Sequence, residues 1–493
     1  MPDEGQDVKL VRGLGLVDAT MIVVGSMIGS GIFIVSAESA RLLGAPGWLL
    51  VAWLLAGIMT ICGALCFAEL AAMMPRAGGP YVFLSEAYGK PLGFLYGWSQ
   101  FLIVQSGTIA AVSVAFANFT GILVPQISAT NYIVEPVIIG RYALSLSTQQ
   151  LLAVGSIVLL TLVNTRGLRL GKWIQNTFTA VKTAALASLV LIGLLLGWNY
   201  GGALFSADLW NGVANGWSLE KAQPAAMAFG PLAFLLVLGR AMTGPLFSQS
   251  AWDNVTFTGG EIENPGRNLP RALIIGCLIV VTLYLLANVA YVVTLSLPEI
   301  QNAANGRVAT AVMEKILGAP GVIVIALALM ISTFGCNNGL ILSGSRVSYA
   351  MARDGFLFRR LALTNKNHVP AFALLAQCTW ACFLVLPRTV SYVEGTLVFG
   401  NVYTQLLEYI VSVDLLSAAL SVMAVIILRR KIPAADRPYR TLGYPVTPVI
   451  FLALAIFVML TLVLLAPGTA GIGYLLALSG IPAYFLWRRG TNR

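Results

Sequence analysis

Long apolar stretches alternate with short polar breaks along nearly the whole chain. A helix of about 20 apolar residues crosses a bilayer core of about 30 Å, so each stretch of that length is a candidate span. We predict twelve spans, at residues 16–37, 47–73, 92–119, 148–164, 173–197, 231–258, 271–295, 320–347, 370–387, 396–428, 446–466 and 470–487. The pattern therefore predicts an all-α integral membrane protein with 12 transmembrane helices and both termini on one side of the bilayer.

The composition excludes other broad classes of protein. Of the 493 residues, 58% are hydrophobic and only 10% are Asp, Glu, Lys or Arg, whereas soluble domains carry about 25% charged residues. A soluble enzyme and a disordered chain are thereby excluded. The 30 Lys and Arg residues exceed the 20 Asp and Glu residues, but they lie between apolar runs and form no basic domain. We therefore expect a lipid bilayer and no nucleic acid as partner.

The basic residues also predict the orientation of the spans, because short cytoplasmic loops retain Lys and Arg. The twelve spans place 22 of the 30 basic residues on the side of the termini and 6 on the opposite side, with Lys182 and Arg240 inside or at the edge of spans. The polar, mixed-charge first dozen residues are no cleavable signal. We predict a multi-pass protein of the cell membrane, inner or plasma, with both termini in the cytoplasm.

The cysteine and histidine residues predict neither a disulfide nor a metal site. His368 is the only histidine, which leaves no histidine cluster for a metal ion. All six cysteines fall within predicted spans, at Cys62, Cys66, Cys277, Cys336, Cys378 and Cys382. No cysteine is therefore placed in an external loop, and we expect no disulfide-linked accessory subunit.

The first span contains a cluster of small residues at mid-depth, Gly25-Ser26-Met27-Ile28-Gly29-Ser30-Gly31-Ile32-Phe33. Small residues spaced by four can bring two helices together, so close packing is one interpretation. The contiguous run from Gly29 to Gly31 does not lie on one helical face, however, and favours unwinding of the helix. A helix break inside a membrane is tolerated only beside protein or a water-filled cavity, so it marks a site.

The sixth span has an interruption of its own. Gly244-Pro245 is followed by a polar run from Phe247 to Asn254 at membrane depth. Spans one and six occupy corresponding positions if the first ten helices form two repeats of five, and paired interruptions of this kind indicate the central site of a transporter. The last two helices are then an appendage.

The ends of such half-helices have a defined chemistry. The half-helix that begins near Ser30 presents backbone N–H groups and a positive dipole end, which suit a carboxylate. The half-helices that end near Met27, and near Phe247 to Ser250, present carbonyl groups, which suit an ammonium group. Together these ends predict a site for an α-amino acid.

Several motifs resemble the amino acid–polyamine–organocation superfamily. They are the small-residue cluster of span one, Ala68-Glu69-Leu70 with Pro75-Arg76-Ala77-Gly78-Gly79-Pro80-Tyr81, and Glu263-Asn264-Pro265 with Arg267-Asn268-Leu269-Pro270-Arg271. Further motifs resemble its L-amino-acid transporter branch, of the bacterial type: Asn164 with Arg166-Gly167, Thr179-Ala180-Val181-Lys182, Asn338-Gly339 with Ser345-Arg346, and Ala352-Arg353-Asp354-Gly355. The resemblance implies a five-plus-five inverted repeat of the LeuT type with broken helices 1 and 6. It also implies alternating access and sodium-independent movement of amino acids, commonly by exchange.

The resemblance also implies roles for individual residues. Ser30 and Gly31 would offer amide groups to the substrate carboxylate, while Met27, Phe247 and Ser250 would offer carbonyl groups to the ammonium. Phe247 would also be the aromatic gate over the substrate. The hinges of the broken helices would be three glycines, Gly25, Gly29 and Gly244.

Two departures from the branch pattern affect the substrate. Ser250 is bulkier than the glycine usual there, and Asp253 adds a carboxylate. A pocket for large aromatic amino acids is therefore not expected. Asp253 lies just past the site, where it would repel anions, attract cationic side chains or line the inner path.

Lys182 is the most informative charge within a span. It is either a structural pin between helices or a fixed cation at the place where sodium-coupled relatives hold an ion, and we favour the second role. Leu340 stands where the branch often has a serine that would partner this lysine. Ser343, Ser332 or the carbonyl group of Gly25 would take its place.

Glu69, Glu408 and Asp414 are further acidic residues within predicted spans. We expect Glu69 to pair with a loop arginine as part of the inner gate, with a simple interfacial cap as the alternative. Glu408 and Asp414 are six residues apart and do not share a helix face, so structural contacts are favoured there over a proton relay.

The predicted organisation follows from these features. It comprises a cytoplasmic N-terminal segment (1–15), the first five-helix repeat (16–197), an extracellular connection (198–230), the second repeat (231–428), a cytoplasmic loop (429–445), helices 11 and 12 (446–487) and a cytoplasmic tail (488–493).

The leading function is a secondary active or facilitative transporter that exchanges neutral L-amino acids, with no cofactor. Nucleotide-binding, nucleophile-elbow and zinc-protease motifs do not occur in the sequence, so an enzyme or primary pump is not expected. A cationic amino acid or polyamine permease, with or without proton coupling, is the alternative of the same class. A channel and a receptor without transport are alternatives of another class.

Overall fold

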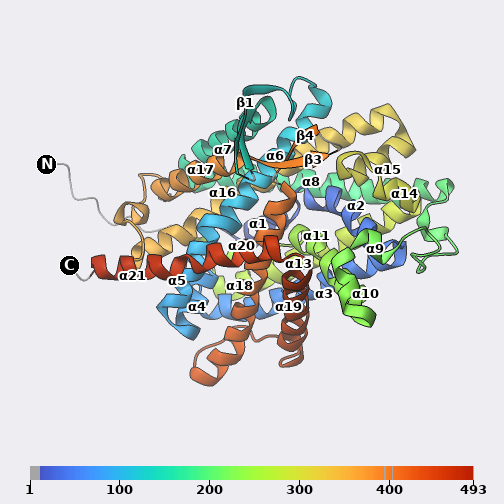
Figure 1. The fold of residues 1–493 in the computed structure, drawn as a ribbon. Helices are drawn as coiled ribbons and strands as arrows, with labels where there is room; N and C mark the ends of the chain where they lie inside the picture. The colour runs from blue at the N-terminus through green and yellow to red at the C-terminus, as the bar shows by residue number, and fades with distance from the viewer. Residues whose placement is uncertain (1–11, 141, 394–395, 402, 492–493) are drawn as a thin grey trace.

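The computed structural model describes residues 12–140, 142–393, 396–401 and 403–491, and these form a mostly helical molecule (Figure 1). Within this described part, eleven helical segments are long and apolar enough to cross a membrane, and the helix Ala371–Val385 is apolar but shorter. Eleven of the twelve predicted spans therefore have a helical segment of spanning length, and the ninth is represented by this shorter helix.

The spans are built from continuous helices and from pairs of shorter ones. They are α1 (Leu16–Met27) with α2 (Gly31–Leu43), α3 (Pro46–Met73), α5 (Lys90–Ser99) with the π-helical turn η1 (Gln100–Val104) and α6 (Gln105–Leu123), α7 (Thr148–Thr165), α8 (Leu168–Leu196), α10 (Ala233–Ala241) with α11 (Thr243–Ser248), α13 (Pro265–Thr294), α16 (Ala319–Arg353), α17 (Ala371–Val385), α18 (Tyr403–Lys431), α19 (Val446–Leu465), and α20 (Pro467–Leu478) with α21 (Gly480–Thr491).

Short helices form most of the connections. They are α4 (Pro80–Tyr88), α9 (Leu219–Ala222), α12 (Asn254–Phe257), α14 (Leu297–Gln301), α15 (Val308–Leu317), and the 3-10 turns η2 (Gly197–Tyr200), η3 (Ala203–Phe205), η4 (Pro224–Leu232), η5 (Gly259–Glu261), η6 (Ala304–Gly306) and η7 (Arg359–Ala362).

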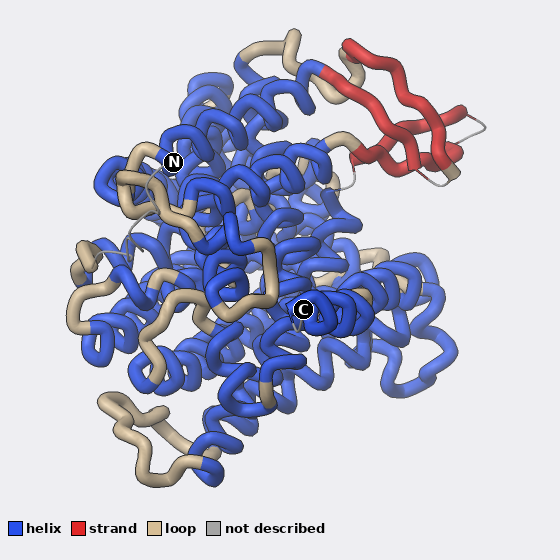
Figure 2. The backbone as a smooth tube through the Cα atoms, turned by 90° about the vertical axis from the view of Figure 1, so that its left-hand side faces the viewer, coloured by secondary structure: helices blue, strands red, loops and turns tan. Residues whose placement is uncertain are grey.

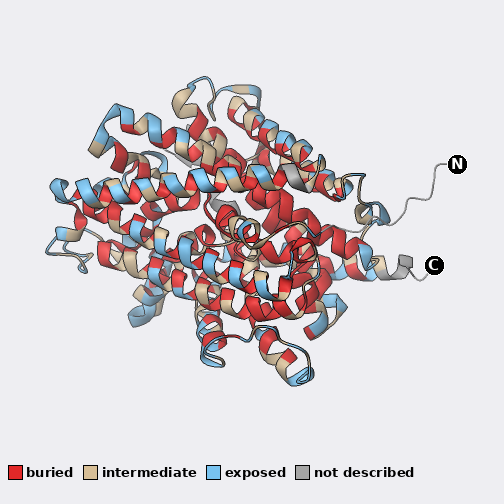
Figure 3. Ribbon diagram, turned by 180° about the vertical axis from the view of Figure 1, so that it is seen from behind, coloured by how far each residue is buried: buried red, intermediate tan, exposed pale blue. Residues whose placement is uncertain are grey.

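The distribution of apolar side chains identifies a membrane protein. Large aromatic residues such as Trp53, Phe67 and Phe119 are buried between the helices, yet Leu195 of α8 is 73% exposed and Leu460 of α19 is 57% exposed. Figure 3 shows buried residues inside the helical body and exposed residues along its outer faces. Water disfavours extended apolar faces of this kind, whereas lipid accommodates them. The chain is a multi-pass membrane protein.

The prediction of an all-α fold is wrong in one region. Four antiparallel strands, β1 (Tyr132–Ile139), β2 (Tyr142–Ser147), β3 (Pro387–Val393) and β4 (Thr396–Asn401), form a sheet in the order β1-β2-β3-β4. Figure 2 shows the sheet at a corner of the helical body. The burial of β2 alternates from residue to residue, as expected of a strand with one face on the protein. The tenth span was accordingly predicted to begin too early, because residues 396–401 belong to β4.

The sheet joins two connections that are distant in sequence. Arg388 of β3 is buried, and its guanidinium donates to the carbonyl group of Ala129 (2.8 Å) and the hydroxyl group of Ser147 (2.9 Å). The loop between the third and fourth spans and the loop between the ninth and tenth thus meet. Both loops follow odd-numbered spans, so their meeting agrees with the alternating topology predicted above.

The N-terminal stretch also contacts a distant connection, the one that follows span six. The amide group of Gly13 donates to the carbonyl group of Glu261 (2.9 Å), and Leu14 forms a parallel bridge with Ile262. The N-terminal stretch thereby pairs with the chain that follows span six. Residues 1–11 of the predicted N-terminal segment lie outside the described residues, and α21 continues to Thr491, into the predicted tail.

Candidate functional site

The first span is interrupted at its middle. Helix α1 ends at Met27, residues 28–30 are non-helical, and α2 begins at Gly31. Ile28 has φ −73° and ψ 89°, outside the helical region. Ser26 and Ser30 are buried here, so protein surrounds the interruption. Gly29 lies in the break, but Gly25 lies inside α1.

Lys182 of α8 reaches this break. Its ammonium group donates to the carbonyl groups of Gly25 and Ile28, the latter at 2.8 Å, and the residue is 1% exposed. These are carbonyl groups at the end of α1, which lack partners within the helix. The Gly25 carbonyl was one of the partners expected for Lys182. Ser332 of α16 also donates to the Ile28 carbonyl, at 3.3 Å.

Helix α13 braces both halves of the broken span. The Tyr284 hydroxyl donates to the carbonyl group of Met27 (2.8 Å), and the Tyr291 hydroxyl donates to that of Ile32 (3.3 Å). Both tyrosines are fully buried. Neither tyrosine was predicted from the sequence, although a tyrosine in an apolar span is a signal because its buried hydroxyl usually needs a partner.

The close approach of α8 to α1 explains why residue 25 is a glycine. A Cβ atom at Gly25 would lie 2.0 Å from the amide nitrogen of Gln175 and 2.3 Å from the hydroxyl oxygen of Thr179. Gln175 accepts a hydrogen bond from Asn338 of α16 at 3.1 Å. The missing side chain therefore lets α1 pack against polar groups of α8, and the role of Gly25 as a hinge stays a prediction.

The sixth span is interrupted after α11. That helix ends at Ser248, residues 249–253 are non-helical, and α12 begins at Asn254. Ala251 has a φ of 63°, a left-handed conformation that costs an alanine energy. Ser250 closes the helix end, because its amide and hydroxyl groups donate to the carbonyl group of Phe247 at 3.1 and 2.7 Å. Gly244 lies within α11, and its hinge role also stays a prediction.

The two interruptions lie against each other. A Cβ atom at Gly31 would lie 2.9 Å from the Cα atom of Ser248, so the N-terminus of α2 directly contacts the C-terminus of α11. Phe247, one residue earlier in α11, is 6% exposed. Amide donors of one helix end thus adjoin carbonyl acceptors of another. Close packing, the alternative interpretation of the glycine cluster, applies at Gly31 as well.

Asp253 lies in different surroundings. It lines a cavity of about 50 Å³ together with Ser250, Gln249 and Asp414 of α18, and no residue of α1 or α2 contributes to that cavity. Ser30 and Gly31 are thus outside the lining of the cavity that Ser250 and Asp253 share. Within the described part of the chain, no group of three or more His, Cys, Asp or Glu residues could hold a metal ion.

A larger cavity of about 430 Å³ lies between α2, α10, α11 and η6. Glu408 lines it and forms an ion pair with Arg240 at 3.6 Å. Glu408 and Asp414 therefore face different cavities, in agreement with the prediction that they do not share a helix face.

A third hollow, of about 460 Å³, lies between the N-terminal stretch, α4 and the end of α16. Tyr81 lines it and donates to the carboxylate of Asp354 at 2.8 Å. Burial raises the pKa of Tyr81, and the hydrogen bond to Asp354 raises this pKa further.

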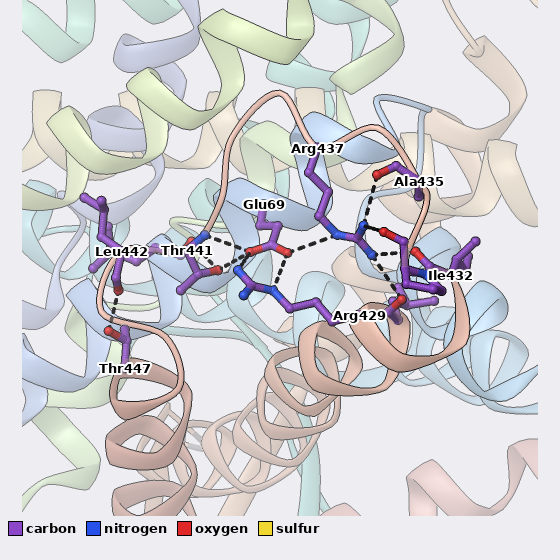
Figure 4. A network of polar contacts seen from close by, with 11 residues as sticks. Glu69, Arg429, Ile432, Ala435, Arg437, Thr441, Leu442 and Thr447 are labelled. Atoms are coloured by element: carbon purple, nitrogen blue, oxygen red, sulfur yellow. Dashed lines mark hydrogen bonds and ion pairs between the residues drawn. The ribbon is translucent and has the colours of Figure 1, made fainter.

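Glu69 of α3 is the centre of a polar network at the end of α18 (Figure 4). Its carboxylate accepts two hydrogen bonds from Arg429 (2.9 and 2.6 Å), and Arg437 lies 3.4 Å away. The amide and hydroxyl groups of Thr441 also donate to it, each at 2.7 Å. The loop that follows α18 is thereby fastened to α3, and the loop-arginine partner expected for Glu69 is present.

A second buried ion pair was not anticipated. Arg346 of α16 contacts the carboxylate of Glu261 through two nitrogens, at 3.2 and 3.0 Å, and both side chains are 1% exposed. The pair fastens α16 to the chain that follows span six. An arginine inside a predicted span was the signal, because such a charge needs a buried partner.

Comparison with known proteins agrees with this arrangement. A family model described as "Amino acid permease" matches residues 14–486. The chain is 29% identical to Asc-type amino acid transporter 1 of Homo sapiens over 99% of this chain and 85% of that protein. It is 31% identical to Large neutral amino acids transporter small subunit 2 of Mus musculus, over 98% and 82%. It is 28% identical to Serine/threonine exchanger SteT of Bacillus subtilis, over 97% and 98%.

These matches confirm the resemblance inferred from the motifs. They also confirm a transporter in place of an enzyme, because the family and these relatives are transporters. The match extends over both interrupted spans and over Lys182. The chain belongs to the amino acid permease family, within the amino acid–polyamine–organocation superfamily of membrane transporters.

Proposed function

We propose that the protein exchanges small to medium neutral L-amino acids across the cell membrane by alternating access. The observation that carries this proposal is the contact between the start of α2 at Gly31 and the end of α11 at Ser248. An α-amino acid has a carboxylate and an ammonium group on one carbon atom, so it needs donors and acceptors side by side. The relatives support the substrate class, because one is named as an amino acid transporter, one as a transporter of large neutral amino acids and one as a serine/threonine exchanger.

The backbone at the two breaks would bind the zwitterion. The amide groups of Ser30 and Gly31 would donate to the carboxylate, in the field of the α2 dipole. The carbonyl groups of Met27, Phe247 and Ser250 would accept from the ammonium. The Met27 carbonyl accepts one hydrogen bond, from Tyr284, and a carbonyl oxygen has a second lone pair for another. The Phe247 carbonyl accepts two, from the amide and hydroxyl groups of Ser250, so one of these would give way to the ammonium.

Lys182 would make the cycle independent of sodium. Its ammonium group already donates to the carbonyl groups of Gly25 and Ile28. The side chain of the protein thus supplies a positive charge at the break of the helix. A bound sodium ion is then unnecessary at that place.

Two gates would alternate. Phe247 would close over the bound substrate, and the cavity of about 430 Å³ lined by Glu408 would be the outer vestibule. On the inner side, the Glu69 network would hold the loop after α18 against α3 until the inner path opens. Gly25, Gly29 and Gly244 would serve as hinges.

The proposed organisation is a LeuT-type inverted repeat of residues 16–197 and 231–428, followed by two further helices. The interruptions in the first and sixth spans support it, since they occupy equivalent places in two repeats of five. Residues 198–230 would form an extracellular connection, and both termini would be cytoplasmic. No disulfide-linked accessory subunit is expected.

A binding screen tests the substrate class. Purified protein should gain thermal stability with its substrates, because a ligand that binds only the native state raises apparent stability. We expect alanine, serine or leucine to displace labelled substrate better than arginine or spermidine. If arginine or spermidine displaces it better, Asp253 serves a cationic side chain and the protein is a cationic amino acid or polyamine permease.

A further inference from the structure

A small polar cavity lies beside the interruption of span six and away from α1 and α2. It has a volume of about 50 Å³, and its walls come from α3, α4, α5, α11, α18, α19 and the non-helical residues 249–253. A water molecule needs roughly 10–15 Å³ of such space. The cavity therefore accommodates a few water molecules or one small ion, but no amino acid.

Two carboxyl groups face this cavity without a counter-charge. Asp253 and Asp414 both line it, so their carboxyl groups share one small cavity. No Lys, Arg or His is found among the described residues of its walls. The titratable groups that face the pair are Tyr96 of α5 and Cys277 of α13, and neither carries a positive charge. The walls from α3, α4 and α19 contribute Met59, Thr60, Phe67, Pro80 and Phe451.

Gln249 provides an independent sign of a ligand. It lines the same cavity and is 1% exposed, and neither its amide nitrogen nor its amide oxygen has a hydrogen-bond partner in the protein. A buried amide group without partners is disfavoured, so a molecule or proton in the cavity has to satisfy it. Its oxygen can accept from a protonated group, and its nitrogen can donate to a carboxylate.

We propose that Asp253 and Asp414 form a binding site for one proton that is loaded and released during transport. This inference rests on the proposed transport function. Two negative charges in one small cavity without a cation repel strongly, and binding one proton removes the repulsion. A hydronium ion in the cavity would give its proton to one carboxylate, leaving water and a carboxylic acid. That acid would donate its hydrogen to the other carboxylate or to the Gln249 oxygen, and release would return the proton to water.

The position of Asp253 connects this proton to the moving part of the site. The backbone carbonyl group of Asp253 accepts hydrogen bonds from the amide and hydroxyl groups of Thr256, at 2.8 and 2.7 Å, where α12 begins. Asp414 belongs to the long helix α18. Loss of the proton would push the non-helical segment of span six away from α18. The segment begins two residues after the gate residue Phe247, so protonation and gate position become coupled.

Infrared difference spectroscopy of the full-length protein in proteoliposomes, without amino acid, tests the site itself. At neutral pH, where exposed Asp side chains are ionised, wild type should show the carbonyl stretch of a protonated carboxyl group. Asp253→Asn and Asp414→Asn should each lose this band, because the partner charge that retains the proton is gone. Glu86→Gln removes an exposed carboxylate that pairs with Arg76 and should keep it.

Three spectroscopic results would overturn the proposal. The first is a wild-type spectrum without the band, and the second is a band that persists in the Asp253→Asn/Asp414→Asn double variant. The third is loss of the wild-type band when sodium chloride replaces choline chloride at constant pH. The last result would identify a sodium site. Asn resembles protonated Asp in size, and the wild-type measurement needs no variant, so a folding defect cannot hide the answer.

A transport measurement tests the coupling. An inward proton gradient should accelerate L-serine uptake by wild type and by Glu86→Gln, and a protonophore should remove this acceleration. Uptake by Asp414→Asn should not be accelerated by the gradient. If the rate of serine counterflow by wild type changes with neither the proton gradient nor the protonophore, proton coupling is refuted and the proposed exchange is not. Absence of counterflow with serine, alanine and leucine would refute both.

Discussion

Lys182 is the single residue on which the proposed transport mechanism depends most. Its ammonium group binds two carbonyl groups at the break of span one. Lys182→Ala removes this group, leaves the buried Gly25 carbonyl without its lysine donor at a cost of about 1–3 kcal/mol, and leaves the Ile28 carbonyl with the Ser332 hydroxyl group. We expect strongly impaired uptake, whereas wild-type uptake should be undiminished when choline replaces sodium.

Lys182→Met is the matched control for this prediction, since it retains the length of the side chain and loses only the charge and the donors. It should be impaired like the alanine variant. A wild-type requirement for sodium, or an active methionine variant, would show that Lys182 only fills space.

The Tyr284 hydroxyl offers a second residue-scale test. Tyr284→Phe removes the 2.8 Å hydrogen bond to the Met27 carbonyl, which should lower stability by about 1 kcal/mol and weaken substrate affinity by loosening the end of α1. Tyr291→Phe, two turns later on α13, removes a longer bond of 3.3 Å and should have a smaller effect. Thermal unfolding and serine binding of both variants measure this. Equal effects in the two would contradict a special role for Met27.

The sequence was sufficient to select important charged residues but not to predict which groups contact them. A lysine deep in an apolar span and an acid at the end of another required partners, so Lys182 and Glu69 could be selected from the sequence. Which groups meet them depends on how helices pack, and so the pairing of Arg346 with Glu261 was missed. For the same reason, the cavity that Asp253 shares with Asp414 was not predicted.

At the scale of elements, the contact between α2 and α11 depends on the absence of a side chain. Gly31→Ala would place a Cβ atom 2.9 Å from the Ser248 backbone, so one helix end has to move. We expect lower thermal stability and loss of uptake. Gly155→Ala in α7 is the control, since that site has open space. It should be neutral or stabilising by up to about 1 kcal/mol. Normal uptake by Gly31→Ala would show that this contact does not shape the site.

The Glu69 network joins a helix to a loop and gives a second element-scale prediction. Glu69→Gln keeps the size of the side chain but removes the charge that Arg429 and Arg437 share. The fold should lose on the order of 2–3 kcal/mol, and residues 432–445 should become more susceptible to limited proteolysis. Glu86→Gln breaks only an exposed pair and should leave proteolysis unchanged. Unchanged cleavage in Glu69→Gln would contradict a fastening role.

The helical spans were predictable because each must be long and apolar on its own, whatever its neighbours. The sheet was not, since its strands are short and the groups they join are far apart, as with Arg388 and Ser145, 243 residues from each other. Strand pairing between distant residues cannot be predicted from the periodicity of apolar residues within one short segment. The start of the tenth span was misplaced for this reason, because the apolar residues of β4 resemble the beginning of a helix.

At the scale of the whole molecule, the described chain forms two sets of connections with different structures. The connections after the third and ninth spans share a sheet, while the N-terminal stretch and the loops after the sixth and tenth spans are fastened by buried ion pairs and backbone bonds. Breaking ion pairs on one side while the other side closes is what alternating access requires. The single cycle would carry an amino acid in each direction.

Counterflow of labelled substrate is a direct test of exchange by alternating access. Proteoliposomes that contain the purified protein receive labelled L-serine outside, with or without unlabelled L-serine inside, in sodium-free buffer. We predict that preloading accelerates uptake, because a carrier returns faster with substrate bound, and that Lys182→Ala loses the acceleration. Uptake that is equal with and without preloading, in protein that binds serine, would contradict an exchanger and indicate a channel or a receptor.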